Sequence, residues 1–235
     1  MDIAEKVLRL KDDFDDVYEA GRKKEYDAFW DAYQDKGNHT SYENAFSGKH
    51  WTDDNFKPKY NIIMSGDYGA NASFRQSQMT DIKGILEKQN VVLDTSQAAR
   101  FTNTFQNSKV TKAPSLNLTG CTLFSQVFYG CTNLTEVELC NLKANCTITG
   151  VFSLCKNLVS LKMINCTIGQ NGFDVQYSNL SHDSLINDEG TGVLNSLEDK
   201  SGTGTVWTIT LGSTNLAKLT DAEKAIATQK GWTLA

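Results

Sequence analysis

The feature that most limits how this chain can fold is an internal repeat. The stretch V-F-Y-G-C-T-N-L-T-E-V-E-L, residues 127–139, aligns without a gap with V-F-S-L-C-K-N-L-V-S-L-K-M, residues 151–163. The two stretches share V-F, then Cys, then N-L, followed by apolar residues at the same offsets. A period of roughly 20 to 50 residues is typical of chains built from stacked units, because no unit can bury its apolar side alone.

Weaker copies extend this repeat. Phe105 precedes Phe128 by 23 residues, with Ser108 in the place of Cys131, and an earlier F-x-x-S step begins at Phe74. Short alternating runs follow the aromatics and predict strands near Leu93, Leu118, Leu139, Met163 and Leu211. The segments between these runs have room for only one turn of helix. For residues 61–212 we therefore predict a unit of one strand and one helical turn, with all strands in one parallel sheet.

The register of the repeat assigns side chains to the two sides of each unit. Nine residues at recurring positions are expected to form the repeat core: Phe105, Phe128, Cys131, Leu134, Leu139, Phe152, Cys155, Leu158 and Leu161. The outward positions of the strands form a polar, mildly acidic candidate binding face: Asn117, Glu136, Glu138, Ser160, Lys162, Thr208 and Thr210. The alternative is that this face is only solvated.

The first 36 residues predict a helix, because they contain no proline and one glycine and are rich in Glu, Lys, Asp and Ala. Their apolar residues follow the spacing of a coiled-coil seam: Ile3, Val7, Leu10, Phe14 and Val17. We expect residues 1–36 to join copies of the chain. The alternative is an amphipathic helix packed against its own domain.

Two segments are expected to cap the repeats. Residues 37–60 mix glycines with irregularly spaced aromatics and predict a linker that covers the N-terminal end. Residues 213–235 predict the opposite cap, in which Thr220 precedes a helix, Gly231 ends it and Trp232 folds back apolar surface. Residues 169–204 match the repeat poorly and predict an inserted helix, with Ser181 or Asp183 as its N-cap.

Charge and cysteine content exclude several classes of protein. The net charge of -5 argues against a nucleic-acid binder, which needs a basic face. No apolar run approaches the roughly 18 residues of a membrane helix, and the N-terminus lacks the apolar region of a secretory signal. We therefore expect synthesis in a cytoplasm and no membrane insertion. All six cysteines lie between Cys121 and Cys166 without a C-x-x-C pair, which favours buried thiols over disulfides or zinc.

Little in the sequence indicates catalysis. The three histidines, His39, His50 and His182, lie in no metal-ligand motif and near no nucleophile in sequence. Phosphate-binding and nucleophile-elbow motifs are absent from the sequence. The acidic pair Asp188 and Glu189 is typical of a surface loop. We predict a chain that is not an enzyme, with no catalytic residue, no metal ligand and no cofactor.

The pattern F-x-x-C-x-N-L-x-x-V-x-L resembles the leucine-rich repeats of the BspA type, over about residues 60–212. The segments from Trp51 and from Leu216 are similar to those of leucine-rich-repeat proteins encoded among tail genes of phages and prophages of gut Firmicutes. The units at Phe74 and Phe105 depart from the pattern because they lack the cysteine. The resemblance implies an α/β repeat: an N-terminal coiled-coil helix, a leucine-rich-repeat solenoid with a short-stranded parallel sheet, and a C-terminal capping helix.

The same resemblance implies a function. It favours a non-enzymatic structural or receptor-binding component of a phage tail or baseplate, located in the virion and made in the cytoplasm of the bacterial host. The symmetry common among tail appendages implies a homotrimer, with other tail proteins and a bacterial surface protein or glycan as partners. A bacterial leucine-rich-repeat adhesin is the main alternative, and a glycan-processing enzyme is a weaker one.

Overall fold

A computed structural model describes residues 42, 45–49, 51–58 and 61–235. Its strands form four small parallel sheets. The two largest are three-stranded: one contains β4 (Leu116–Asn117), β6 (Glu136–Cys140) and β8 (Ser160–Ile164), and the other β3 (Arg100–Thr102), β5 (Leu123–Ser125) and β7 (Thr147–Thr149). The other two pair β1 (Ile62–Gly66) with β2 (Leu93–Ala98) and β9 (Trp207–Ile209) with β10 (Trp232–Leu234).

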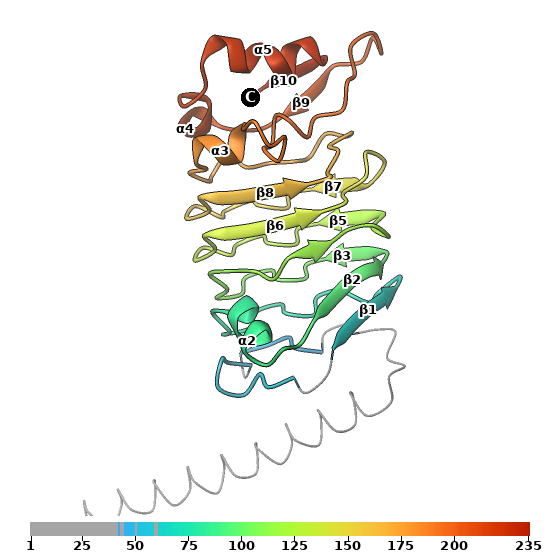
Figure 1. Ribbon diagram of the computed structural model, residues 1–235, viewed down its shortest axis with the longest axis vertical. Helices are drawn as coiled ribbons and strands as arrows, with labels where there is room; N and C mark the ends of the chain where they lie inside the picture. Colours follow the sequence, from blue (N-terminus) through green and yellow to red (C-terminus); the bar gives the residue numbers. More distant parts are fainter. Residues whose placement is uncertain (1–41, 43–44, 50, 59–60) are drawn as a thin grey trace, which may run out of the picture.

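The strands lie one above another along the long axis of the molecule (Figure 1). Equivalent residues of successive units are paired in the sheets. Val137 in β6 lies opposite Leu161 in β8, and Phe124 in β5 lies opposite Ile148 in β7. Each of these layers thus contributes one strand to each three-stranded sheet, and a turn connects the two strands. The apolar side chains between the two sheets belong to one core.

A column of phenylalanine rings passes through that core. Phe74, Phe105, Phe128 and Phe152 are stacked with centroid separations of 5.0, 5.1 and 5.5 Å and interplanar angles of 2°, 8° and 3°. All nine residues assigned to the repeat core from the sequence are exposed by 1% or less. The period in the sequence therefore corresponds to a column of buried side chains, one layer apart.

The predicted fold class, an α/β repeat solenoid with one parallel sheet, is wrong. The described residues contain four helices, of which only α2 (Ile82–Lys88) and α5 (Asp221–Gln229) have seven residues or more. The strands are divided among four sheets of two or three strands instead of forming one. The predicted seam at Ile3, Val7, Leu10, Phe14 and Val17 lies outside the described residues, so no coiled coil is shown.

Backbone conformation explains why the turns between strands are not helical. Equivalent residues of three successive turns, Asn103, Gln126 and Gly150, have φ of 58°, 50° and 54°. Such residues cannot continue a right-handed helix. The N–H groups of these turns pair with the next layer instead: Phe105 N donates to Val127 O at 2.8 Å. The length of these segments leaves room for one turn of helix, but the left-handed residues make the turns non-helical.

A buried hydroxyl separates β2 from β4 and so interrupts the expected single sheet. Thr95, which is 1% exposed, receives the N–H of Asn117 on its Oγ1 at 2.9 Å. The same hydroxyl donates to Asn117 O at 3.0 Å. The Thr95 side chain thereby takes the place of the backbone groups that would have continued the sheet hydrogen bonds. The backbone N–H and C=O of Asn117 both keep a hydrogen-bond partner.

The C-terminal part differs from the repeats below it. The predicted inserted helix is only the four-residue α3 (His182–Leu185), which is N-capped by Ser181. A second short helix, α4 (Ser213–Leu216), is followed by α5, where Thr220 and Glu223 form a capping box. Gly231, with φ of 81°, leads into β10, and Trp232 is 2% exposed. These elements cover the upper end of the stack (Figure 1).

Candidate functional site

The outward side of the β4–β6–β8 sheet carries the polar residues that the sequence singled out. In β6 and β8 the inward residues are buried, whereas Glu136 and Glu138 are half-buried and Ser160 and Lys162 are exposed. Glu136 lies opposite Ser160, and Glu138 lies opposite Lys162. Together with the half-buried Asn117 on β4, these four residues form what we call the strand face.

Two of the predicted face residues lie elsewhere. Thr208 and Thr210 are at β9, which pairs with β10 in a separate sheet. Thr210 forms an isolated parallel bridge with Asp174, and the N–H of Thr208 donates to Asn171 Oδ1 at 2.8 Å. The structure thus brings together five of the seven predicted residues. The last strand was misplaced because the repeat pattern fails between residues 169 and 204, which left its register undefined.

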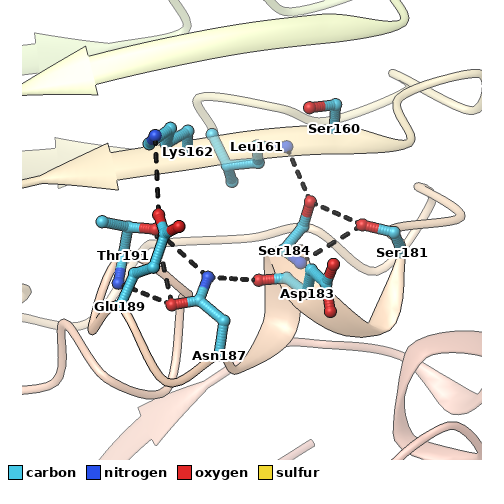
Figure 2. Close-up of a pocket in the computed structure, with 9 residues that line it drawn as sticks. All are labelled: Ser160, Leu161, Lys162, Ser181, Asp183, Ser184, Asn187, Glu189 and Thr191. Carbon is cyan, nitrogen blue, oxygen red and sulfur yellow. Dashed lines mark hydrogen bonds and ion pairs between the residues drawn. The ribbon is translucent and has the colours of Figure 1, made fainter.

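One pocket adjoins the strand face where β8 meets α3. This α3 pocket has a volume of about 350 Å³ and is lined by Ser160, Leu161, Lys162, Ser181, Asp183, Ser184, Asn187, Glu189 and Thr191. Figure 2 shows Lys162 and Glu189 pointing toward each other across it, with Nζ and Oε2 3.7 Å apart. Both side chains are largely exposed, at 47% and 74%, so this ion pair is weak and leaves both charges available to a ligand.

Ser184 attaches α3 to β8. Its hydroxyl accepts the N–H of Leu161 at 2.9 Å and donates to Val159 O at 3.2 Å. These two backbone groups would otherwise bond to a further strand. This role cannot be predicted from the sequence, because a lone serine beyond the recognisable repeats gives no signal. The consequence is that the floor of the α3 pocket is held to the sheet by a buried hydroxyl.

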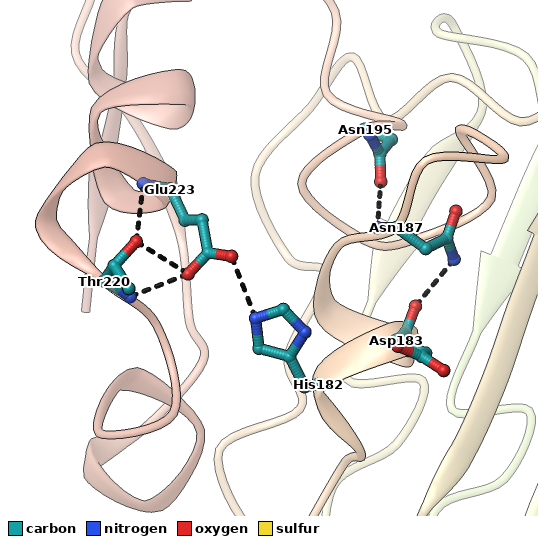
Figure 3. A network of polar contacts seen from close by, with 6 residues as sticks. All are labelled: His182, Asp183, Asn187, Asn195, Thr220 and Glu223. Atoms are coloured by element: carbon teal, nitrogen blue, oxygen red, sulfur yellow. Dashed lines mark hydrogen bonds and ion pairs between the residues drawn. The ribbon is translucent and has the colours of Figure 1, made fainter.

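Asn187 holds the loop that forms the outer wall of the pocket. Its Nδ2 donates to Asp183 O at 2.7 Å, and its Oδ1 accepts the N–H of Thr191 at 3.0 Å. Its own N–H donates to Asn195 Oδ1 at 3.1 Å (Figure 3). The Asn187 side chain therefore ties α3 to Thr191, and its backbone N–H ties the same loop to Asn195, so the wall is held by hydrogen bonds within the chain.

A second pocket lies at the carboxyl ends of the same strands. This strand-end pocket, of about 440 Å³, is lined by Val92, Leu93, Asp94, Ser115, Asn117, Cys140, Asn141, Ile164 and Asn165. Asn141 Nδ2 donates to Asn117 Oδ1 at 3.0 Å, so amides of successive layers are linked. The strand face is therefore flanked by a charged pocket on one side and an amide-rich pocket on the other.

The strand face also receives a charge from an earlier layer. Lys83 of α2 places its Nζ 3.2 Å from Glu136 Oε1, and this hydrogen bond raises the pKa of Lys83. Within the part of the chain that the structure describes, Glu138 forms no ion pair, and its Oε1 accepts a long hydrogen bond from Cys140 Sγ at 4.0 Å. Glu138 is thus the negative group of the face with most freedom to bind a partner.

The described residues do not assemble a recognisable reactive centre. Burial raises the pKa of Cys131 and of Cys166 to about 11, so these thiols stay protonated near neutral pH. His182 bonds to Glu223 at 2.9 Å (Figure 3), whereas His39 and His50 lie outside the described residues. Asp188 and Glu189 are both exposed. Among the residues that the structure describes, no three His, Cys, Asp or Glu side chains are grouped as metal ligands.

A search of the described helices finds none that is both long and apolar enough to span a bilayer. Comparison of the chain with models of protein families, with curated proteins and with solved structures gives no match.

Proposed function

We propose that this chain is a non-enzymatic recognition protein whose strand face, with the α3 pocket, contacts the partner. The observation that carries the proposal is a contrast within two paired strands. The inward pairs are alike, such as Val137 opposite Leu161, whereas the outward pairs differ in charge, Glu136 opposite Ser160 and Glu138 opposite Lys162. Variation confined to the outward positions of a stacked scaffold is typical of binding surfaces.

The physical properties of the face fit this role. Its side chains project from strands whose opposite side is packed in the core, so the backbone of the face loses little conformational entropy when a partner binds. Charges of both signs, hydroxyls and amides converge around a pocket of about 350 Å³. A partner that presents many hydroxyl or charged groups, such as a bacterial surface glycan or protein, is complementary to such a surface.

The setting that we propose is the tail or baseplate of a phage, with the strand face as a host-recognition surface. This part of the proposal is supported by the resemblance of the cysteine-containing repeat and of the terminal segments. Copies joined through residues 1–36 would bind a repetitive cell surface with avidity greater than that of one chain.

Binding of the full chain to isolated surface material tests the proposal. Cell-wall polysaccharide and surface proteins purified from Firmicutes would be immobilised, and binding measured by surface plasmon resonance. We expect the Lys162→Gln and Glu138→Gln variants to bind at least tenfold more weakly, because each removes a charge from the face.

The matched control is Lys224→Gln, since Lys224 lies on α5 and, like Lys162, has one long ion pair, 3.9 Å from Asp221. It should bind as the wild type does. Equal binding by wild type, Lys162→Gln and Glu138→Gln would exclude the strand face as the contact surface. Release of sugars from the polysaccharide would contradict the non-enzymatic assignment.

A further inference from the structure

We propose that Cys121 and Cys146 are the site of a disulfide bond that links two neighbouring layers of the stack. Their Sγ atoms lie 3.4 Å apart, and both side chains are buried, at 3% and 0% exposure. The sequence favours buried thiols over disulfides, and it contains no C-x-x-C pair. The two residues are 25 positions apart and are brought together by the stacking of layers.

The backbone around the pair has suitable geometry. Cys121 lies just before β5 and Cys146 directly before β7, and these strands are paired from Leu123 opposite Thr147 onward. Next to the cysteines, Thr147 N donates to Thr122 O at 3.0 Å. Continued by one residue, this register places Cys146 beside Thr122, so Cys121 and Cys146 lie diagonally across the two strands. A spacing of about 4.8 Å between strands and about 3.3 Å along them puts the two Cα atoms about 6 Å apart, within the roughly 4.4–6.8 Å that a disulfide requires. Bond formation needs the sulfur atoms to approach by only ~1.4 Å.

The other four cysteines are arranged differently. Cys131 and Cys155 each donate to a carbonyl of the preceding layer at 2.9 Å, that of Phe105 and that of Phe128. Cys166 donates to Leu139 O at 3.4 Å, and Cys140 lies 3.5 Å from Ser115 Oγ. No other pair of thiols in the described ranges is in contact, so oxidation should select Cys121 and Cys146.

The oxidant that we specify is a small disulfide such as oxidised glutathione. The thiolate of Cys146 attacks one sulfur of the oxidant, forms a mixed disulfide and releases one glutathione, which takes up a proton. The Cys121 thiol then loses its proton, attacks the sulfur of Cys146 and releases the second glutathione. Two protein S–H groups are oxidised to one S–S bond, and one oxidised glutathione is reduced to two thiols.

One feature favours first attack by Cys146, and another gives the oxidant access to the pair. The hydrogen bond from Cys121 lowers the pKa of Cys146, although burial opposes the effect, so Cys146 is the better nucleophile. The residues on both sides of each cysteine, Gly120, Thr122, Asn145 and Thr147, are exposed. Each buried cysteine is therefore flanked in the chain by exposed residues. Local opening at the beginnings of β5 and β7 is enough to admit the oxidant.

Thiol counting on the full chain tests the proposal. Protein would be incubated with oxidised or with reduced glutathione, denatured, alkylated with N-ethylmaleimide and weighed as the intact chain. The reduced sample should carry six adducts, one for each cysteine, and the oxidised sample two fewer. Tryptic digestion of the oxidised sample should join the peptides 113–143 and 144–156. Six adducts after oxidation would overturn the proposal.

Variants identify the two partners. In Cys121→Ser or Cys146→Ser the oxidised sample should lose no adduct relative to its own reduced sample, whereas the control Cys140→Ser should still lose two. A bond that persists in Cys121→Ser would assign the oxidation to another pair and overturn the proposal. In the wild type, oxidation should raise the melting temperature by about 5–10 °C, because the cross-link restricts the unfolded chain. An unchanged or lowered value would contradict the layer-linking role.

Discussion

At the scale of single residues, a repeated phenylalanine defines the interior. Phe128 stacks on Phe105 and on Phe152 at nearly parallel orientation, and its side chain is fully buried. A cysteine recurs three residues later in two layers, and its thiol donates to the carbonyl of the phenylalanine below, as Cys155 does to Phe128 O. The recurring phenylalanines thus pack against one another across successive layers, and the recurring cysteines form hydrogen bonds between those layers.

Replacing Phe128 with alanine should therefore be costly. The Phe128→Ala variant loses both ring contacts and leaves a cavity, and we expect its free energy of unfolding to fall by about 3–5 kcal/mol. Urea denaturation followed by circular dichroism measures this change. The control Tyr129→Ala, at a half-exposed neighbour, should cost less because less apolar area is buried there. A cost below about 1 kcal/mol for Phe128→Ala would mean that the ring column does not support the stack.

At the scale of elements, the C-terminal helix α5 is stabilised by its first turn. Glu223 Oε2 accepts the N–H and the hydroxyl of Thr220 at 2.7 and 2.8 Å, and Glu223 Oε1 bonds to His182 Nε2 of α3 at 2.9 Å (Figure 3). These hydrogen bonds, first those from Thr220, lower the pKa of Glu223. One carboxylate thus caps α5 and connects it to the first residue of α3.

Stability should consequently depend on pH through Glu223. A carboxyl whose pKa is lowered by folding stabilises the protein above its unfolded-state pKa, and this contribution is lost as the pH falls through the folded-state pKa. We expect Glu223→Gln to unfold at lower urea concentration than the wild type at pH 7, with the difference shrinking at acidic pH. A difference that stays constant with pH would show that the charge of Glu223 does not act this way.

Two further variants separate the parts of this capping arrangement. Thr220→Ala removes the N-cap hydroxyl and should cost about 0.5–2 kcal/mol at neutral pH. Glu189→Gln alters a carboxylate that is 74% exposed and whose ion pair among the described residues is the long one with Lys162, so its unfolding curve should match that of the wild type. A large effect of Glu189→Gln would place the acid-sensitive group in the α3 pocket.

At the scale of the whole molecule, residues 1–36 lie outside the described residues, and their predicted role in joining copies of the chain stays a prediction. Light scattering on the full chain should give about three times the mass of one chain. The double variant Val7→Asp with Leu10→Asp places charges in the seam and should give single chains, whereas Arg9→Asp, which lies away from the predicted seam, should not change the mass. A wild type that scatters as a single chain would exclude the predicted oligomer.

The repeat between residues 127 and 163 was enough to place Phe128, Cys131 and Leu139 in the interior, because a period in the chain becomes a column in the stack. It was also enough to bring Glu138 and Lys162 to one face. The α3 pocket could not be predicted in this way. Ser184 and Asn187 lie beyond the recognisable repeats, and their roles depend on which backbone groups of β8 and of the following loop lack partners.

Sequence periodicity thus specified which side chains are buried, since burial repeats whenever equivalent units stack. The backbone conformation of the segments between these buried side chains depends on contacts between layers. The turns for which the sequence predicts one turn of helix instead contain left-handed residues and form hydrogen bonds to the next layer, and the Thr95 hydroxyl divides the expected sheet. The approach of Cys121 to Cys146 has the same origin, because the stacking of layers brings the side chains of residues 25 positions apart in the chain into contact.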